Sequence, residues 1–180
     1  MATSQTEIES QAIELSAEAL KTFCEDISGI FGASTQCNQQ QAAVETVTAL
    51  KERFKKLAAV FFIKAEGALE GTLQLILNRE GLFTLAGVIL NMPEQKILEN
   101  REHGSLENAQ GMSDVIGQAG DLMASAWQRV FDEKLDGQGH FVKTNTFIGD
   151  PWDKPEEKIG LASDEKLLFV PYEIKIELYS

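Results

Sequence analysis

The fold is decided by the stretch AAVFFIKAEGALEGTLQLILN, which covers residues 58–78. Residues 58–65 and 72–77 are two apolar runs of strand length, rich in aromatic and branched side chains. Only six positions, from Glu66 to Gly71, connect them, and glycines at both ends suit a tight turn. The stretch therefore predicts an antiparallel β-hairpin.

Helices are predicted on both sides of this hairpin. Ser4 to Glu7 fits a capping box, and Gly32 is a suitable stop, so a first helix is expected between them. Residues 79–90 also repeat apolar side chains at helical spacing, and Pro93 ends that pattern. The apolar stripe of the first helix comprises Ile8, Ala12, Leu15, Ala19, Phe23, Ile27 and Ile30.

The segment 34–57 supports two interpretations. Val44, Val47, Leu50, Phe54 and Leu57 recur at helical spacing, whereas residues 44–48 are rich in β-branched side chains. Periodicity does not choose between a helix throughout and a strand in the first half.

The second half of the chain carries a long helix and then strands. Residues 94–107 are polar and are expected to include a loop, and residues 105–131 show a long amphipathic helical pattern. A strand is expected at 141–148, a loop at 149–155 and a half-buried strand at 172–178. This order predicts a single α+β domain over residues 1–180, with an antiparallel sheet covered by long amphipathic helices.

Composition limits the classes of partner. The chain has 16 basic and 28 acidic residues, a formal net charge of −12, which argues against nucleic acid and anionic membranes. Cys24, Cys37, His103 and His140 lack metal-site spacing, so no metal or cofactor of its own is expected. The start of the chain has no signal-peptide pattern and no apolar run spans a membrane, so a cytoplasmic location is expected.

Two tryptophans and one histidine are expected to have structural rather than functional roles. Trp127, in the long helical pattern, is expected to pack in the core, and Trp152, in a polar loop, to cover the core. His140 has no acid at a telling spacing and is expected to be an ordinary loop residue.

One face of the long helix holds polar groups that could do chemistry. Asp114, Gln118, Asp121 and Ser125 follow one another at intervals of four, three and four residues, so they share a face. Opposite them lie Ile116, Ala119, Met123, Ala126 and Val130. Spacing alone favours the solvated face of an amphipathic helix over a functional site.

The residues 71–90 and 114–125 resemble the CheC/CheX/FliY family of chemotaxis phosphatases. In that family a Gly-led strand feeds a short helix, and a long helix presents Asp or Ser, then Glu, then Asn at this spacing. The resemblance implies a cytoplasmic two-component signalling protein whose helix face docks on a phosphorylated CheY-type receiver. The Glu would pair with the receiver's lysine, and the Asn would orient the water that attacks its phosphoaspartate.

This chain departs from the family motif at the positions that matter most. Asp114 takes the first position, but Gln118 stands at the Glu position and Asp121 at the Asn position. No Glu-x-x-Asn sequence occurs anywhere in the chain. The resemblance therefore supports fold and partner class more strongly than it supports catalysis.

Two readings of the substitution remain open. In one, the roles are exchanged: Gln118 orients the water while Asp121 or Asp114 meets the lysine, as in the similar Asp and Gln pair of the unrelated phosphatase CheZ. In the other, the site is catalytically inactive because Gln118 lacks charge and Asp121 repels the phosphoryl group.

The expected function is thus binding of a phosphorylated CheY-type receiver with hydrolysis of its phosphoaspartate, catalysed by Gln118, Asp121 and Asp114. The Mg²⁺ would come with the receiver. The alternative is an inactive module that binds a receiver or a component of the flagellar switch. The resemblance also implies a homodimer paired through sheet edges.

Overall fold

The computed structural model describes residues 5–54, 56–137 and 139–177. The central hairpin is confirmed: β3 (Ala58–Gly67) and β4 (Gly71–Asn78) pair antiparallel, with Ala58 opposite Asn78 and Ala65 opposite Gly71. On its other edge β3 pairs antiparallel with β5 (Gly139–Gly149), so the order of this sheet is β4-β3-β5. The expected α+β class with antiparallel sheets is therefore correct.

Two further strand pairs extend the β-structure. β1 (Thr35–Gln39) pairs with β7 (Tyr172–Ile176), and β2 (Ala43–Thr46) pairs with β6 (Lys166–Phe169), both antiparallel. A backbone hydrogen bond from Gln40 N to the Pro171 carbonyl joins the two pairs where the chain passes from one strand to the next. The predicted tail strand is confirmed for residues 172–176, and Leu178 lies outside the described residues.

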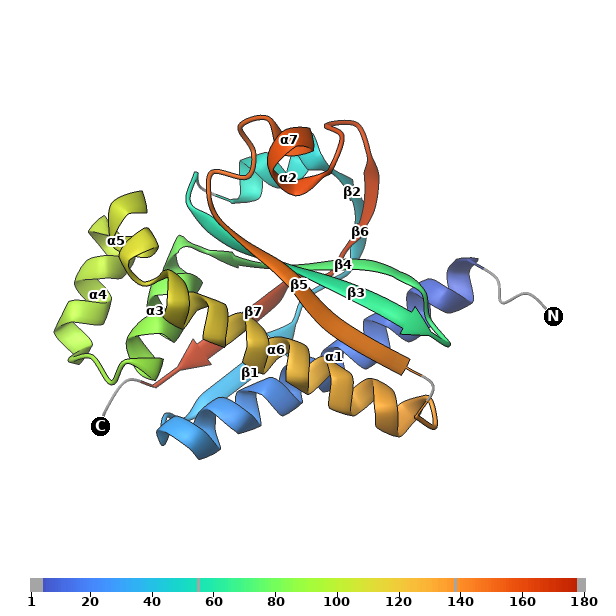
Figure 1. Ribbon diagram of the computed structural model, residues 1–180, viewed down its shortest axis with the longest axis horizontal. Coiled ribbons are helices and arrows are strands. Elements are labelled where there is room, and N and C mark those ends of the chain that lie inside the picture. The colour runs from blue at the N-terminus through green and yellow to red at the C-terminus, as the bar shows by residue number, and fades with distance from the viewer. Residues whose placement is uncertain (1–4, 55, 138, 178–180) are drawn as a thin grey trace.

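Two long helices cover one side of the sheet. In Figure 1, α1 (Gln5–Phe31) and α6 (Ser113–Lys134) lie side by side; α6 packs on β5 and β3, and α1 packs on α6 and β1. α3 (Arg79–Ile89), α4 (Glu94–His103) and α5 (Leu106–Gly111) gather at one end of α6, and α2 (Val47–Arg53) and α7 (Pro155–Ile159) lie at the opposite side of the sheet. The first helix is as predicted, although Ser4 of the expected capping box lies outside the described residues.

The first six residues of β3, Ala58 to Ile63, are apolar and are covered on both faces of the sheet. Ala59, Phe61 and Ile63 belong to the main core beneath α1, α3 and α6. Val60 packs on the opposite face in a smaller cluster with Val47, Leu50, Trp152 and Ile159. A continuous apolar run, rather than strict alternation, is the pattern of a strand buried on both faces.

The segment 34–57 resolves as strands followed by a helix. β1 and β2 come first, and α2 begins after Thr46, whose side-chain oxygen accepts a hydrogen bond from the Ala49 backbone N–H. This cap decides where the helical pattern starts, because it satisfies an N–H that has no partner within the helix.

The loop expected within residues 94–107 is confined to Gly104 and Ser105, and most of that segment forms α4. This helix has almost no apolar stripe: Ile97 and Asn100 are its only buried residues. Ile97 packs closely over Gly87 of α3, where a Cβ atom would lie 2.5 Å from Ile97 Cγ1. One apolar anchor over a glycine holds the helix, and so small a contact leaves no periodic signal.

The long helix predicted for 105–131 is divided into α5 and α6 at Met112, and α6 continues to Lys134. Ser105 and Asn108 form a capping box that starts α5, and Met112 leaves helical geometry with φ −107° and ψ 14°. Over the described residues, no helix is long and apolar enough to cross a membrane.

Candidate functional site

The polar face of α6 is placed as its spacing predicted. Asp114, Gln118, Asp121 and Ser125 are all exposed, and these four residues are called the α6 stripe below. The opposite face is buried in the main core: Ile116, Ala119, Met123, Ala126 and Val130 are each at most 5% exposed. The stripe therefore lies on a helix whose rotation is fixed by the core.

A glycine brings α6 close to the sheet. A Cβ atom on Gly120 would lie 2.4 Å from Cδ1 of Phe61 on β3. At that distance no side chain could replace the glycine unless α6 or Phe61 moved. Arg129 also pairs with Asp26 of α1, and Lys134 Nζ lies 3.4 Å from Glu18 Oε2. Close packing against β3 and ion pairs with α1 together fix the position of the stripe.

Sequence analysis missed one residue of this site, Lys143 on β5. Its Nζ lies 2.7 Å from Oδ1 of Asp121 and donates a hydrogen bond of 2.9 Å to the carbonyl of Gly117. The Lys143 side chain is 17% exposed, while that of Asp121 is 65% exposed. Because a mostly buried ammonium group needs oxygen partners, Lys143 holds the Asp121 carboxylate against the helix surface.

The strand pattern contains a signal for Lys143. Phe141 is buried, and Lys143 follows it by two residues. Because alternate side chains of a strand lie on the same face, Lys143 is expected on the buried face of β5 with Phe141. A lysine directed inward from a sheet requires an acid or a carbonyl within reach. A β-bulge follows immediately: Phe62 is opposite Asn145 and Ile63 is opposite Lys143, so Thr144 has no partner of its own in the ladder.

Asp114 and Gln118 differ from Asp121 in having no such constraint. Within the described residues, neither side chain takes part in a hydrogen bond or an ion pair, and both are exposed. Asp114 lies in the first turn of α6, where the helix dipole favours a negative charge. The stripe thus presents one compensated acid, one uncompensated acid and one unengaged amide.

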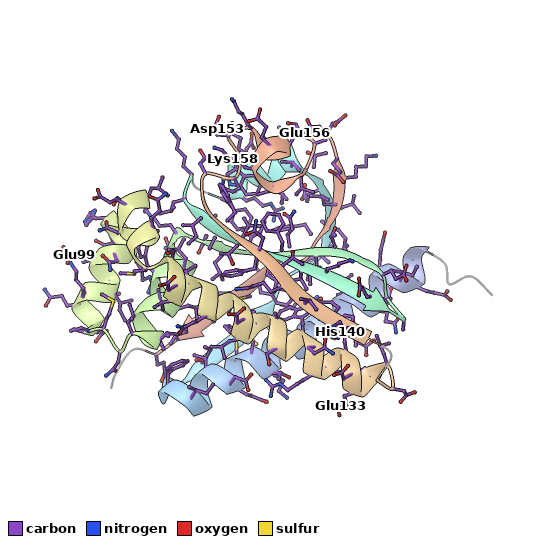
Figure 2. The ribbon with its side chains drawn as sticks, in the orientation of Figure 1. Glu99, Glu133, His140, Asp153, Glu156 and Lys158 are labelled. Carbon is purple, nitrogen blue, oxygen red and sulfur yellow. The ribbon has the colours of Figure 1, made fainter. Side chains whose placement is uncertain are left out.

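The other singled-out residues have structural roles or none. Trp127 is 1% exposed in the main core, and Trp152, 5% exposed, stacks on Phe54 with ring centroids 5.7 Å apart, so both tryptophan predictions are confirmed. His140 is an exposed residue of β5 rather than of a loop, which corrects its predicted location. It lies far from α7, near the end of α6 where Glu133 is found (Figure 2).

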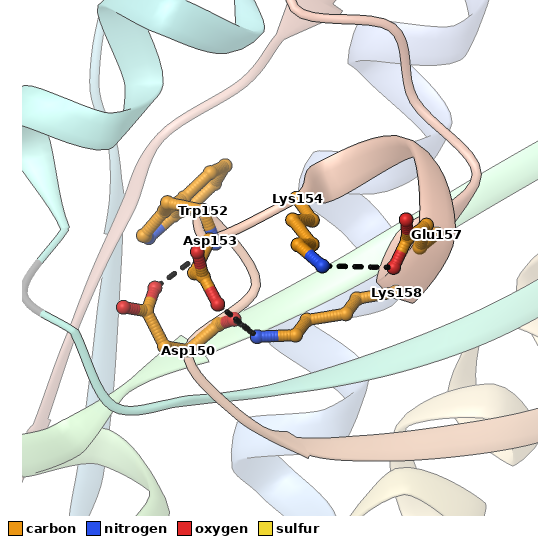
Figure 3. A network of polar contacts seen from close by, with 6 residues as sticks. All are labelled: Asp150, Trp152, Asp153, Lys154, Glu157 and Lys158. Atoms are coloured by element: carbon orange, nitrogen blue, oxygen red, sulfur yellow. Dashed lines mark hydrogen bonds and ion pairs between the residues drawn. The ribbon is translucent and has the colours of Figure 1, made fainter.

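A separate polar network surrounds Trp152 (Figure 3). Lys158 Nζ donates to the Asp150 carbonyl at 3.2 Å and to Asp153 Oδ2 at 3.0 Å. The hydrogen bond and charge of Lys158 lower the pKa of the exposed Asp153 carboxyl. These contacts fix the loop that places Trp152 over the smaller cluster.

Across residues 5–54, 56–137 and 139–177, no group of three or more His, Cys, Asp or Glu residues could hold a metal ion.

Comparison with solved structures identifies the fold. The architecture is that of FliY and of the FliM middle domain. FliY from Thermotoga maritima matches with a TM-score of 0.72 at 17% identity, over 100% of this chain and 88% of FliY. The FliM middle domain from H. pylori matches with a TM-score of 0.63 at 13% identity, over 97% of this chain and 87% of that one.

A third match is the FliG–FliM complex from H. pylori, with a TM-score of 0.65 at 9% identity, over 97% of this chain and 88% of the matched chain. Neither a protein-family model nor a curated protein matches the sequence. The expected resemblance to the CheC/CheX/FliY group is therefore confirmed as a likeness of fold.

Proposed function

We propose that this protein is a chemotaxis signalling module that binds a phosphorylated CheY-type receiver through the α6 stripe. The observation that carries the proposal is the ion pair between Lys143 and Asp121 beside two unengaged polar side chains, Asp114 and Gln118. The likeness of fold to FliY and FliM supports a chemotaxis or flagellar-switch role without distinguishing an enzyme from a binding module.

Charge compensation makes the stripe compatible with a phosphorylated partner. A bare carboxylate at position 121 would repel an anionic phosphoryl group, and Lys143 offsets this repulsion at 2.7 Å. Asp114, which is not compensated, remains available for the receiver's lysine. This division assigns the lysine contact to Asp114 rather than to Asp121, and leaves the Mg²⁺ with the receiver.

The proposal is tested by titrating the protein with a CheY-type receiver, either unphosphorylated or phosphorylated by a small acyl phosphate with Mg²⁺. We expect tighter binding to the phosphorylated form, and Asp114→Asn should weaken it by about fivefold, equivalent to roughly 1 kcal/mol. Glu133→Gln, an exposed acid at the other end of α6, is the matched control. Equal binding to both receiver forms, or equal effects of the two substitutions, would overturn the proposal.

Hydrolysis of the phosphoaspartate is a second candidate function, favoured by the exposed and unengaged amide of Gln118. In this reaction a water oxygen bonds to phosphorus, the bond from phosphorus to the aspartate oxygen breaks, and phosphate leaves as the carboxylate is regenerated. Gln118 would orient the water through its amide, as positioning alone contributes strongly to phosphoryl transfer.

Turnover is measured by the loss of radiolabelled phosphate from the receiver, with and without this protein. If the wild-type protein leaves the receiver's own rate unchanged while Gln118→Glu combined with Asp121→Asn accelerates it, this chain is a binding module. If the wild-type protein accelerates hydrolysis and Gln118→Ala abolishes the effect, the enzyme assignment holds.

A further inference from the structure

A cavity separates the two groups of strands on the side of the sheet away from β5. Its volume is ≈ 680 Å³, and it is lined by residues 73–78 of β4 and by residues 168–176. The latter segment covers the end of β6, the whole of β7 and the link between them, and is called the β6–β7 ribbon below. Leu20 of α1 and Met123 and Trp127 of α6 close the cavity on the helical side.

Two unpaired strand edges face this cavity. In the described part of the chain, β4 pairs only with β3, β6 only with β2 and β7 only with β1. In a strand with one neighbour, every second residue directs its N–H and C=O away from that neighbour. Both walls of the cavity therefore offer backbone donors and acceptors without a ladder.

Unpartnered side-chain atoms also line the cavity. Trp127 Nε1 and Gln74 Oε1 are buried and have no hydrogen-bond partner among the described residues, and Trp127 is only 1% exposed. Gln74 is held in place because its Nε2 donates to the Ile159 carbonyl at 2.8 Å. An indole donor and an amide acceptor are the partners that backbone C=O and N–H groups of an added segment would satisfy.

The chain itself indicates what shape of ligand belongs there. The order of helix, strand, short helix and strand occurs twice: α1, β1–β2, α2, β3, and then α6, β5, α7, β6–β7. Pairing between the two units is reciprocal, since β1 and β2 pair with the β6–β7 ribbon and β5 pairs with β3. In the first unit, β3 pairs with β5 on one edge and with β4 on the other. In the second unit, the β6–β7 ribbon pairs with β1 and β2 on one edge, and its other edge faces the cavity where the first unit has β4.

The size and charge of the cavity match a short strand. A residue in a packed sheet takes roughly 160 Å³, from a strand spacing of about 4.8 Å, a layer spacing of about 10 Å and a rise of about 3.3 Å. A volume of ≈ 680 Å³ thus corresponds to about four residues. The lining of the cavity has no net formal charge, because Glu80 and Glu173 are matched by Arg101 and Lys175. The whole chain, in contrast, carries −12, so an uncharged ligand suits the cavity.

We propose that this cavity binds an extended, uncharged peptide segment of a partner protein as an added strand between β4 and β7. The segment would carry apolar or β-branched side chains on both faces, because the main core lies on one side of the cavity and Phe54 and Phe169 of the smaller cluster lie on the other. Strand addition draws its affinity from main-chain hydrogen bonds and its selectivity from alternate side chains.

The probe is a blocked peptide of alternating valine and threonine, about six residues long, and its control is the same peptide with alternate backbone nitrogens methylated. We expect calorimetry to show binding of the unmethylated peptide, and about tenfold or greater weakening on methylation because several backbone hydrogen bonds are lost. Hydrogen exchange should show new protection at amides of β4 and β7 only with the unmethylated peptide.

A matched pair of substitutions locates the binding site. Val170→Trp fills part of the cavity and should weaken peptide binding by about tenfold, whereas Val142→Trp, at an exposed position of β5, should leave binding unchanged. The unfolding temperature of each variant verifies that it folds, and the methylated peptide tests the wild-type protein independently of both.

Three results would overturn the inference. No binding up to about 1 mM of the unmethylated peptide would remove the strand site, since that limit corresponds to about 4 kcal/mol of affinity. Equal binding of the methylated peptide would make the cavity an ordinary apolar pocket. A dimer detected by light scattering, which Val170→Trp abolishes and the peptide dissociates, would assign the cavity to a second copy. Receiver binding is measured with the α6 stripe variants, so failure of either proposal leaves the other standing.

Discussion

At the scale of single residues, Lys143 determines the charge that the α6 stripe presents. It lies on β5, 22 positions after Asp121 in the sequence, and reaches across to that carboxylate and to the Gly117 carbonyl. The helix periodicity could predict the stripe, because all its members lie on one element. It could not predict the lysine, because the contact depends on how β5 packs against α6.

Replacing this lysine should weaken binding of the phosphorylated receiver. Lys143→Met keeps most of the side-chain volume but leaves the Asp121 carboxylate uncompensated beside the phosphoryl group, so we expect about fivefold weaker binding, roughly 1 kcal/mol. Isothermal titration with phosphorylated receiver measures the change. Lys96→Met, which removes an exposed lysine paired with Glu99 on α4, should have no effect. Unchanged or tighter binding by Lys143→Met would contradict the assigned role.

The two cysteines should differ in reactivity. Cys24 is buried on α1, and burial, reinforced by a hydrogen bond with Cys37, raises the pKa of its thiol. Since the thiolate is the reactive form, a raised pKa leaves less of it at mildly alkaline pH. Iodoacetamide at about pH 8 should therefore label Cys37, which is half-buried, well before Cys24, and intact-mass analysis with peptide mapping checks the order. Faster labelling of Cys24 would show that α1 opens.

At the scale of secondary-structure elements, the sequence predicted those with a strong local signal. The β3–β4 hairpin, α1, α3, α6 and β7 all carry apolar patterns of the right period, and each was found. α4 was missed because its stability depends on Ile97 packing over Gly87 rather than on an apolar stripe. The break at Met112 was missed because apolar side chains continue across it at helical spacing, at Ala109, Met112 and Ile116.

Two glycines of α6 should respond in opposite directions to a methyl group. Gly120→Ala places a Cβ against Phe61 and should destabilise the protein by about 1–3 kcal/mol, because a close-packed contact must open. At Gly117 the nearest atom to a Cβ is Lys143 Nζ at 3.9 Å, so Gly117→Ala should stabilise by up to about 1 kcal/mol through helix propensity.

Urea unfolding followed by circular dichroism measures both changes in the free energy of unfolding. If Gly120→Ala stabilised the protein as Gly117→Ala is expected to, α6 would not approach β3 as closely as the structure has it.

At the scale of the whole molecule, net charge controls how fast a partner arrives. With −12 overall, this protein repels a receiver whose phosphorylation site has an acidic rim, and added salt screens that repulsion. We therefore expect the association rate constant to rise between about 50 and 200 mM NaCl, measured by stopped-flow fluorescence. A rate that falls with salt would indicate attraction by a basic surface of the receiver.

The family resemblance implies that the protein forms a homodimer, and this remains a prediction. Light scattering coupled to size exclusion, across a tenfold range of concentration, tests it. A mass near 19.8 kDa at every concentration would show a monomer.

The separation of the core into two clusters gives the molecule two optical reporters. Trp127 of α6 is buried in the main core, and Trp152, which belongs to the loop fixed by Lys158, lies across the sheet with Phe54. A small cluster buries less apolar surface and can open below the global unfolding free energy. Emission from Trp152, isolated in a Trp127→Phe variant, should change at lower urea than emission from Trp127 in a Trp152→Phe variant. The lobe around α2 and α7 could then loosen while α6 keeps its shape.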